Sequence, residues 1–532
     1  MPRDEEMAFL LREIDLDRWR HQGQPSNTPV SSDSVSFHLG RRKSNSSHFL
    51  GRPDSGQVSR TTFLQGLRFC VLFGTIIGLR ALLHLAWNTA YRFCTASSPS
   101  AGVNLAAVQQ CTIENLQRDL SFLKGAQPIT VSEFIQRQDR LAAVLYQTGI
   151  DAFIVEPGYT FQYYSNVSQQ DWEPWEPEER PFLMVMQPSI HDDDTVTAKT
   201  TYLAAHFEED RVRQLGIPSR SALDIITWEE SSNPYSELLS KAFGNAKGQS
   251  VVVDEEMRDF LVRGLSSAGF KTIGLTPDIE AIRQQKTSSE MSILRAVNTG
   301  TVEAIRAMRP CLRAGLLEKD VISILNNALL SIPGFSLFFN LVLFDSNAAL
   351  PHGGKATGAL ALTPTTVVLI DVGAHYFGYS SDITRSFIIG EPPNTLEELS
   401  ADLSLKQRVF STVLAAQTAS VAHFRPGQVA ANVDLAARAT ITRLSPAGQN
   451  WASRFTHRVG HGIGIKAHES PYLHSGNTKT LLRENMTFTS EPGIYLPRQF
   501  GVRTEDVFAV TREKNGEVVC LSGRGARSLW DP

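Results

Sequence analysis

The segment VVLIDVGAHYFGYSSDITRSF (367–387) begins with an apolar run typical of a buried strand and leads directly into Asp371. Asp382 follows eleven residues later. If the segment folds back as a hairpin centred on Tyr376 and Phe377, the two aspartates lie directly opposite each other, with about 5 Å between their Cβ atoms. Two like charges at this distance destabilise a hairpin unless another group compensates them. The segment therefore predicts both a β-hairpin and a need for positive charge beside it.

A second pair of carboxylates repeats this arrangement. Glu491 ends one predicted strand and Glu505 lies within another, so a hairpin that turns at Arg498 sets the two glutamates opposite each other. Because side chains alternate along a strand, Asp506 points to the other face. Between the two pairs, the segment HRVGHGIGIKAHE (457–469) carries three histidines among glycines, which let backbone and imidazole groups crowd a small volume.

Four carboxylates and a histidine that converge on one point would repel each other strongly. Two divalent cations would cancel a ligand charge of about −4, and an oxygen-dominated set with one imidazole favours manganese or a similarly hard ion over a structural zinc. Taken alone, each acid would more commonly be solvated or paired with an arginine, for which Arg385 and Arg503 are available. Their joint occurrence favours a dinuclear site, in which two ions share a water and lower its pKa.

The composition sets limits on this interpretation. The chain has 532 residues and a formal charge of −4, with 42% hydrophobic and 20% charged residues; this excludes a wholly disordered or fibrous protein and predicts two or more domains. The near-neutral charge removes the electrostatic argument for a nucleic-acid partner. The five cysteines are scattered, which argues against a disulfide framework and a zinc–cysteine site but leaves a single bridge open.

The N-terminal part of the chain differs from the rest. Residues 1–60 are polar and predicted to be a disordered tail, and residues 61–95 contain the apolar run Phe69–Trp87, which has the length of a single transmembrane helix. Arg80 and His84 interrupt the run, so an amphipathic surface helix is the alternative. An excess of arginine before the run predicts a single-pass membrane protein whose catalytic domain is lumenal or external; without the span, we expect a cytoplasmic protein.

Two folded domains follow. Residues 96–129 are predicted to be a linker, and the alternation of helices and strands after them predicts an α/β domain over residues 130–278. The sequence Thr287-Ser-Ser-Glu290 is a capping box, which opens a long helix near the start of a second domain, residues 279–532. All of the carboxylate and histidine candidates lie in this second domain.

The C-terminal motifs resemble those of the pita-bread metallopeptidases, the family of aminopeptidase P, prolidase and methionine aminopeptidase. The resemblance covers about residues 130–532, and the matching segments are IRQQKTSSEMSILRAVN (282–298), ALPHGG (349–354), DVGAHYFGYSSDITRSF (371–387), HRVGHGIGIKAHESPYL (457–473), EPGIY (491–495) and GVRTEDV (501–507). It implies a pita-bread α+β catalytic domain preceded by a creatinase-type α/β N-terminal domain. The histidine motifs are nearer the branch that cleaves Xaa-Pro bonds than the methionine branch.

The resemblance also implies a set of metal ligands. They are Asp371, Asp382, His461, Glu491 and Glu505. By the family pattern, Asp382 and Glu505 bridge the two ions, and Glu491 also helps to take a proton from the bridging water.

Four further residues match supporting positions of the family, namely His352, His457, His468 and Arg503. The resemblance implies that the histidines position substrate and stabilise the tetrahedral intermediate, and that the arginine supports Glu505. Lys466 departs from the pattern, because relatives commonly have an acidic or small residue at this point before the histidine. We expect it to be an ordinary surface lysine.

These implications predict a metal-dependent exopeptidase, an aminopeptidase or dipeptidase, that hydrolyses Xaa-Pro bonds in a peptide or dipeptide. Such a bond is a tertiary amide without an N–H, which peptidases that rely on that donor handle poorly. The expected cofactors are two divalent ions per chain, with Mn²⁺ first and Co²⁺, Zn²⁺ or Fe²⁺ as alternatives, and the expected assembly is a homodimer. The rival predictions are a hydrolase of the same fold that acts on a non-peptide amide, and a non-catalytic binding protein.

Overall fold

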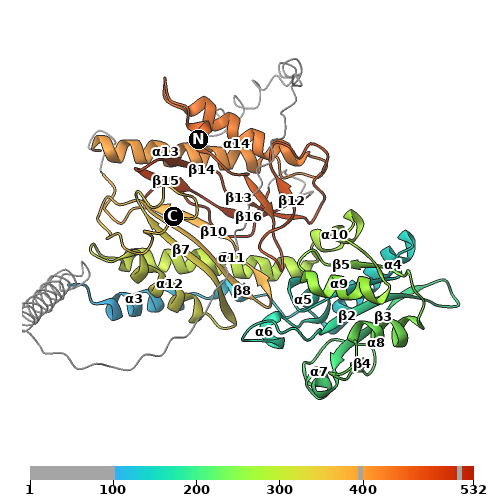
Figure 1. Cartoon of the computed structure of the whole chain (residues 1–532). Coiled ribbons are helices and arrows are strands. Elements are labelled where there is room, and N and C mark those ends of the chain that lie inside the picture. The colour runs from blue at the N-terminus through green and yellow to red at the C-terminus, as the bar shows by residue number, and fades with distance from the viewer. Residues whose placement is uncertain (1–101, 394–398, 512–517) are drawn as a thin grey trace, which may run out of the picture. The chain divides into compact units, whose positions relative to one another are not determined.

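The computed structural model describes residues 102–393, 399–511 and 518–532, which belong to one compact unit of the chain. The first half of this unit contains a six-stranded mixed sheet in the order β4-β3-β2-β1-β5-β6, of which Figure 1 labels β2, β3, β4 and β5. Its strands are β1 (Ala152–Val155), β2 (Leu183–Ile190), β3 (Val196–Ala205), β4 (Asp224–Trp228), β5 (Ser250–Val253) and β6 (Lys271–Ile273). Because β1 and β5 are parallel, their carboxyl ends lie at the same edge of the sheet.

Helices alternate with these strands, as the sequence predicts. They are α4 (Val131–Thr148), α5 (Tyr159–Ser165), α6 (Gln169–Trp172), α7 (Glu209–Gln214), α8 (Pro234–Phe243), α9 (Asp259–Ala268) and α10 (Pro277–Gln284), with short 3₁₀ turns η2 (Ser121–Leu123) and η3 (His206–Glu208). Thr130 begins α4 by accepting a hydrogen bond from the N–H of Glu133, and Gly149 ends it in the left-handed conformation at φ 68°. Local capping therefore sets the limits of this helix.

The second half contains the strands that carry the candidate site. One sheet has the order β10-β8-β7, with β9 paired to β8, and a second has the order β12-β11-β13-β16-β17. The strands are β7 (Phe335–Phe344), β8 (Val368–Tyr376), β9 (Tyr379–Ser380), β10 (Ile383–Phe387), β11 (Gly460–Gly462), β12 (Glu469–Leu473), β13 (Thr487–Ser490), β16 (Asp506–Ala509) and β17 (Val519–Cys520). The hairpin of β14 (Gly493–Leu496) and β15 (Phe500–Arg503) connects β13 to β16.

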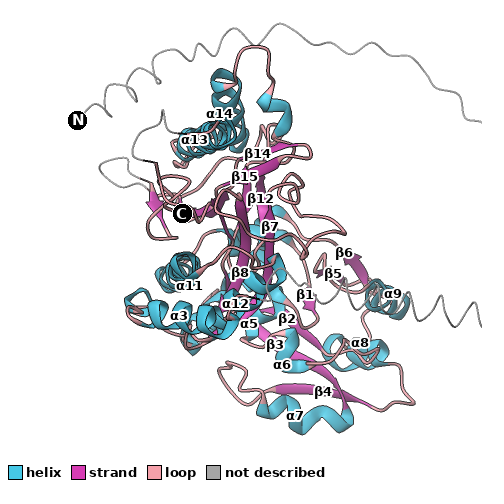
Figure 2. Cartoon of the chain, turned by 90° about the vertical axis from the view of Figure 1, so that its left-hand side faces the viewer, coloured by secondary structure: helices cyan, strands magenta, loops and turns pink. Residues whose placement is uncertain are grey.

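Two groups of helices cover these strands. In the first group, α11 (Ser288–Met308) contacts β8, β9 and β10, α12 (Glu318–Leu330) contacts β7, and α3 (Leu105–Gln117) packs on both helices. In the second, α13 (Ala401–Val421) and α14 (Ala430–Leu444) pack on each other, and α13 contacts β13, β14 and β15. Figure 2 shows the strands between the two groups. The strands that carry the site are thus supported on both sides.

The start of α11 confirms the predicted capping box. The hydroxyl of Thr287 accepts from the N–H of Glu290, and the Glu290 carboxylate accepts from the N–H of Thr287. One hydrophobic cluster includes Phe153 of the six-stranded sheet, Ile293 of α11 and Ile370 of β8. The domain boundaries at residues 130 and 278 stay predictions.

One disulfide is present among the described cysteines. Cys111 of α3 is bonded to Cys311, at the end of the 3₁₀ turn η4 (Arg309–Cys311), and their Cα atoms lie 5.9 Å apart. The bridge spans 200 residues of sequence. It is the single bridge that the scattered cysteines left open, and it joins α3 to the C-terminal end of α11.

The prediction of a single-pass membrane protein is corrected by the structure. Among the described residues, no helix is both long enough and apolar enough to cross a membrane. The run Phe69–Trp87, on which the prediction depended, lies outside the described residues. The prediction gave apolar length more importance than Arg80 and His84, whose insertion into a bilayer costs free energy. The transmembrane, membrane and lumenal assignments are therefore not retained.

Candidate metal centre

The first predicted hairpin forms, but its register differs from the prediction. Thr384, not Asp382, lies opposite Asp371 in the β8–β10 ladder. The turn lies at Phe377 and Gly378, with φ angles of 47° and 83°, one residue later than predicted. Glycine adopts positive φ without a Cβ penalty, so the turn forms around Gly378. The shift is by two residues, which keeps both aspartates on the same face but makes them diagonal neighbours.

The second hairpin has the predicted register. Gly493 pairs with Arg503 in the β14–β15 ladder, and the β13–β16 ladder on the other side continues the same register. The two ladders place Glu491 opposite Glu505, as the turn at Arg498 predicts. Arg498 itself has a positive φ of 63°, consistent with its place in the turn.

Asp506 lies on the other face of the strand from Glu505, as alternation predicts. Its Oδ1 accepts a hydrogen bond from Nη2 of Arg385 at 2.6 Å, and its Oδ2 accepts one from Nε2 of Gln417 at 3.2 Å. Arg385 also donates to the backbone carbonyl of Glu505 at 2.7 Å. The Asp506–Arg385 pair therefore holds β16 on the face opposite the cluster, while Glu505 faces the cluster.

The five predicted ligands come together, and His468 joins them. Three groups of ligand atoms each lie within 4.8 Å of one another: Asp371, Asp382 and Glu505; Asp382, His461 and His468; and His461, Glu491 and Glu505. Nε2 of His461 lies 3.4 Å from Oε1 of Glu491 and 3.6 Å from Oδ2 of Asp382. Because the groups share members, they form a single cluster, which the two hairpins, β11 and the loop after it build together.

The chemistry of this cluster fits divalent cations. Oδ1 of Asp371 and Oε1 of Glu505 are buried and have no hydrogen-bond partner among the described residues. A buried carboxylate oxygen without a partner is costly, and a cation removes that cost. Carboxylate oxygens with one or two imidazoles suit ions such as manganese. The residues present therefore could hold metal.

Burial and mutual repulsion perturb the acids of the cluster. Burial, and then the charges of Asp371 and Glu491, raise the pKa of Asp382 well above its usual value. Burial and the charge of Asp382 do the same to the pKa of Glu505. Burial raises the pKa of Glu491 to about 7. The cluster therefore retains protons unless a cation replaces them.

His461 presents a lone pair to these acids. Burial lowers the pKa of His461 well below its usual value, so the imidazole is neutral. Its Nδ1 lies 3.1 Å from the carbonyl oxygen of Gly462, which places the N–H there and leaves the lone pair on Nε2. That nitrogen is the one that faces Asp382 and Glu491.

Arg503 connects the two hairpins. Its Nη2 donates to Oδ2 of Asp371 at 2.5 Å, and its Nε donates to Oγ1 of Thr384 at 2.9 Å. The Thr384 hydroxyl in turn donates to Oε2 of Glu505 at 2.7 Å, so Arg503 reaches that glutamate through Thr384. Nη1 of Arg503 donates to the hydroxyl of Tyr495 at 2.9 Å.

Thr384 and Tyr495 are two site residues that the sequence analysis missed. The correct register of the first hairpin places Thr384 opposite Asp371, and alternation places Tyr495 on the same face as Glu491. Both signals were therefore present in the sequence. Thr384 was missed because the predicted register was wrong. Tyr495 was part of the matching segment EPGIY (491–495) but was given no role.

His457 lies beside Tyr495. Its Nε2 is 2.8 Å from the Tyr495 hydroxyl, and its Nδ1 is 2.8 Å from the carbonyl oxygen of Arg458. Burial lowers the pKa of His457 to about 3, so the ring is neutral and its N–H lies on Nδ1. Nε2 then accepts the hydrogen bond of the tyrosine hydroxyl, which itself accepts from Arg503.

The other two predicted histidines lie at the open side of the cluster. The His468 side chain is 59% exposed, and its Nε2 lies 3.7 Å from Oδ2 of Asp382. Its ring makes an edge contact with His461, with 4.2 Å between the centroids. His352 is exposed in the turn after β7, and the carbonyl of the preceding Pro351 accepts from Nη1 of Arg503 at 3.2 Å.

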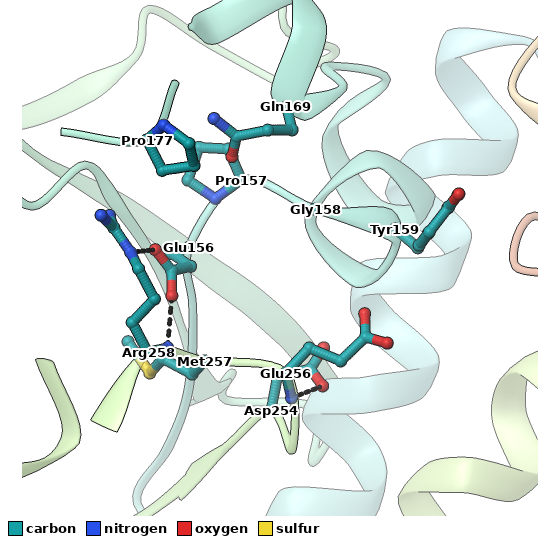
Figure 3. Close-up of a pocket in the computed structure, with 10 residues that line it drawn as sticks. All are labelled: Glu156, Pro157, Gly158, Tyr159, Gln169, Pro177, Asp254, Glu256, Met257 and Arg258. Atoms are coloured by element: carbon teal, nitrogen blue, oxygen red, sulfur yellow. Dashed lines mark hydrogen bonds and ion pairs between the residues drawn. The ribbon is translucent and has the colours of Figure 1, made fainter. Parts of the chain in front are cut away.

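A cavity of about 130 Å³ lies at the carboxyl ends of β1 and β5 (Figure 3). Its lining includes Glu156, Tyr159, Glu256 and Arg258, and none of its lining residues belongs to the cluster. Nε of Arg258 donates to Oε2 of Glu156 at 2.8 Å, so this carboxylate is already compensated (Figure 3). The convergence of ligand atoms, not the cavity, therefore marks the candidate site.

Comparison with known proteins finds similarity to a metallopeptidase family and to individual peptidases. Residues 292–512 match the family model described as metallopeptidase family M24. An uncharacterized peptidase of Schizosaccharomyces pombe is 34% identical over 431 residues, which cover 80% of this chain and 88% of the relative. The Xaa-Pro dipeptidase of Lactobacillus delbrueckii subsp. lactis is 30% identical over 304 residues, which cover 54% of this chain and 76% of the relative. The crystal structure of dipeptidase PepE from Mycobacterium ulcerans superposes with a TM-score of 0.63 at 26% identity. The superposition covers 75% of this chain and 98% of that structure.

Proposed function

We propose, from the premise that the chain belongs to metallopeptidase family M24, that it is a metal-dependent exopeptidase that hydrolyses the bond before a proline. The observation that supports this most is the single cluster of ligand atoms from the five residues Asp371, Asp382, His461, Glu491 and Glu505. We propose that these residues hold two divalent ions, with Mn²⁺ first and Co²⁺, Zn²⁺ or Fe²⁺ as alternatives. A homodimer stays a prediction.

The bound ions would supply the positive charge that lowers the pKa of a water molecule and polarises the carbonyl of the scissile bond. Asp382, Glu505 and His461 each belong to two of the three groups of ligand atoms, and of these three residues only the two carboxylates have a second oxygen with which to bridge two ions. Glu491 is proposed to accept a proton from the attacking water and return it to the leaving nitrogen.

The surrounding residues orient these groups. Arg503 holds Asp371 directly and Glu505 through Thr384, which limits the movement of both acids. His457 and Arg503 fix the Tyr495 hydroxyl between them. The exposed histidines, His352 and His468, are proposed to contact substrate and to stabilise negative charge on its carbonyl oxygen.

The chemistry around the cluster favours a substrate with a free carboxylate, such as an Xaa-Pro dipeptide. The guanidinium of Arg458 packs over the ring of Tyr472, with 4.6 Å to the centroid. Among the described residues, no ion pair includes Arg458, and its Nε is buried without a hydrogen-bond partner. The side chain as a whole is half-buried, and a substrate carboxylate would be an ion-pair partner for its guanidinium. One relative in the comparison is itself named an Xaa-Pro dipeptidase.

The test uses protein stripped of metal and then restored with Mn²⁺. We expect release of proline from an Xaa-Pro dipeptide only after restoration, and much slower cleavage of the matching Xaa-Ala dipeptide. Asp382→Asn should abolish turnover, whereas Asp278→Asn, which changes an exposed acid of α10, should not. Metal-loaded protein that cleaves neither Xaa-Pro dipeptides nor Xaa-Pro-Yaa peptides would remove the peptidase proposal.

The same experiment separates the two rivals. A hydrolase of a non-peptide amide should bind about two ions per chain and leave every peptide intact. A binding protein that has lost catalysis should bind no stoichiometric metal. Measurement of metal per chain alongside turnover therefore assigns each result to one function.

A further inference from the structure

The loop between β11 and β12 carries His468, and it rests on the hairpin that carries Asp382. The N–H of Ser380 donates to the carbonyl of Gly464 at 2.9 Å, and the Ser380 hydroxyl donates to the carbonyl of Ile465 at 2.9 Å. The start of the loop is therefore fixed by two hydrogen bonds to β9. His468 follows near the end of the loop, with most of its side chain exposed.

Glu469, the next residue, is buried and fixed by two cations. It is 3% exposed, and Lys286, which is 4% exposed, donates from Nζ to its Oε1. Nε of Arg283 lies 3.2 Å from its Oε2. Nη1 of Arg283 also donates to Oγ1 of Thr160 at 2.8 Å, which connects the group to α5. Both cations come from the segment between the six-stranded sheet and α11.

The loop fits closely over this ion pair. A Cβ on Gly464 would lie 2.9 Å from Cε of Lys286 and 3.2 Å from Oε1 of Glu469, so only glycine fits without a shift. Adjacent side chains in an extended segment point to opposite faces. Because Glu469 points toward Lys286, the preceding His468 points to the opposite face. A change at the buried pair should therefore move the imidazole relative to Asp382.

A second contact holds the outer side of the loop. Nζ of Lys466 forms an ion pair with Glu256. The side chain of Lys466 is 28% exposed and that of Glu256 is 44% exposed. Figure 3 shows Glu256 at the cavity at the ends of β1 and β5, with its carboxylate directed away from Arg258. Lys466 is thus partnered rather than an ordinary surface lysine, but a pair this exposed contributes little compared with a buried one.

We propose that Glu469, held by Lys286 and Arg283, is a positioning residue that places His468 against Asp382 for catalysis. The inference rests on the proposed function, in which His468 contacts substrate. It assigns a role to the segment 282–298, which joins the two halves of the described unit. Lys286 and Arg283 of this segment hold the loop that carries His468, although neither belongs to the ligand cluster.

The test is a double-mutant cycle with kcat, KM and bound metal measured for each protein. Glu469→Gln should lower kcat about 10- to 100-fold, because small displacements of catalytic groups are costly. KM for an Xaa-Pro dipeptide and the metal content should stay unchanged. In a His468→Ala background, the same substitution should change kcat by less than about 2-fold, because its target is already absent. Lys286→Met should reproduce the Glu469→Gln result.

A control for stability uses Leu265→Ala, which truncates a fully buried side chain of α9 in a hydrophobic cluster that contains no residue of the loop. It should lower Tm and leave kcat per metal-loaded chain unchanged. Equal losses of kcat in Leu265→Ala and Glu469→Gln would assign the effect to general destabilisation and overturn the proposal. Full additivity of Glu469→Gln with His468→Ala would overturn it as well.

A second readout needs no turnover and so separates this inference from the proposed function. In protein labelled with ¹⁵N in its histidine rings, Glu469→Gln should shift the ring signals of His468. The signals of His191, exposed on the loop between β2 and β3, should not move. Unchanged His468 signals would refute the positioning role, whereas shifted signals in a protein without peptidase activity would refute only the proposed function.

Discussion

Arg503→Met should separate the two hairpins of the cluster. The arginine is 2% exposed and donates hydrogen bonds to Asp371, Thr384 and Tyr495 at 2.5, 2.9 and 2.9 Å, and to the backbone carbonyl of Pro351 at 3.2 Å. Methionine has a similar length but neither a charge nor a donor. The substitution therefore leaves a buried carboxylate, a hydroxyl, a phenol and a backbone carbonyl without the donor that they share.

The expected magnitude follows from this count. Removal of one partner from a buried ion pair costs about 3–5 kcal/mol, because the remaining charge stays buried. The three neutral acceptors can turn to other partners or water, so each adds at most about 1 kcal/mol. Bound divalent ions would compensate the charge of Asp371. The loss of unfolding free energy should therefore be about 3–8 kcal/mol in metal-free protein and clearly smaller with Mn²⁺.

The assay is urea unfolding, followed by tryptophan fluorescence, with and without saturating Mn²⁺. Arg295→Met is the matched control, since this exposed arginine donates, among the described residues, only to the backbone carbonyl of Cys520 at 3.2 Å. It should change stability by less than about 0.5 kcal/mol. If metal-free Arg503→Met unfolds with the free energy of the control, the pair with Asp371 has no stabilising role and the reasoning fails.

Three further predictions concern protons and one hydroxyl. Because burial and neighbouring acids raise the pKa of Asp382 and Glu505 well above their usual values, and burial raises the pKa of Glu491 to about 7, metal binding at pH 7 should release protons. The release should be at least about half a proton from Glu491 alone, measured by calorimetry in buffers of different ionisation heat; heats independent of buffer would contradict it. Burial lowers the pKa of His375 to about 4, below the usual value near 6.5, so the unfolded chain binds the proton first and stability falls as pH drops through 6.5. Wild type should lose about 2 kcal/mol more than His375→Gln between pH 7 and pH 5, by urea unfolding; equal losses would show that the histidine is not the cause. Tyr495→Phe removes the hydroxyl between His457 and Arg503 and should lower kcat about 10-fold with bound metal unchanged, whereas loss of metal would give the hydroxyl a different role.

The two hairpins show how far local sequence rules reach. The second was predicted in its correct register, because the turn at Arg498 follows a proline and the glutamates are symmetric about it. The first was placed one residue too early, because the turn needs positive φ at Gly378 and the prediction ignored this requirement. The comparisons nonetheless confirm the family and the α/β class. The error in register was harmless for the site, because a shift of two residues keeps both aspartates on one face. The creatinase-type character of the first half stays a prediction.

Contacts between distant segments were beyond such rules. The Lys286–Glu469 pair joins residues 183 apart and the Lys466–Glu256 pair joins residues 210 apart. Periodicity and turn chemistry describe neighbours along one element, and they give no distance between two loops that meet only after folding. A surface lysine was therefore the reasonable expectation for Lys466, and the buried partner of Glu469 could not have been named.

Two adjacent carboxylates, Glu505 just before β16 and Asp506 at its start, provide an internal comparison for the metal proposal. Asp506 has an arginine, Arg385, at 2.6 Å and an amide from Gln417 at 3.2 Å, so the fold supplies compensation on that face. On the other face, Oε1 of Glu505 is buried and has no hydrogen-bond partner among the described residues, while Asp382 adds a second acid nearby. Within the described residues, the fold thus provides positive charge for one of these adjacent acids and none for the other. Such a difference is expected where the missing charge comes from ions that the protein binds.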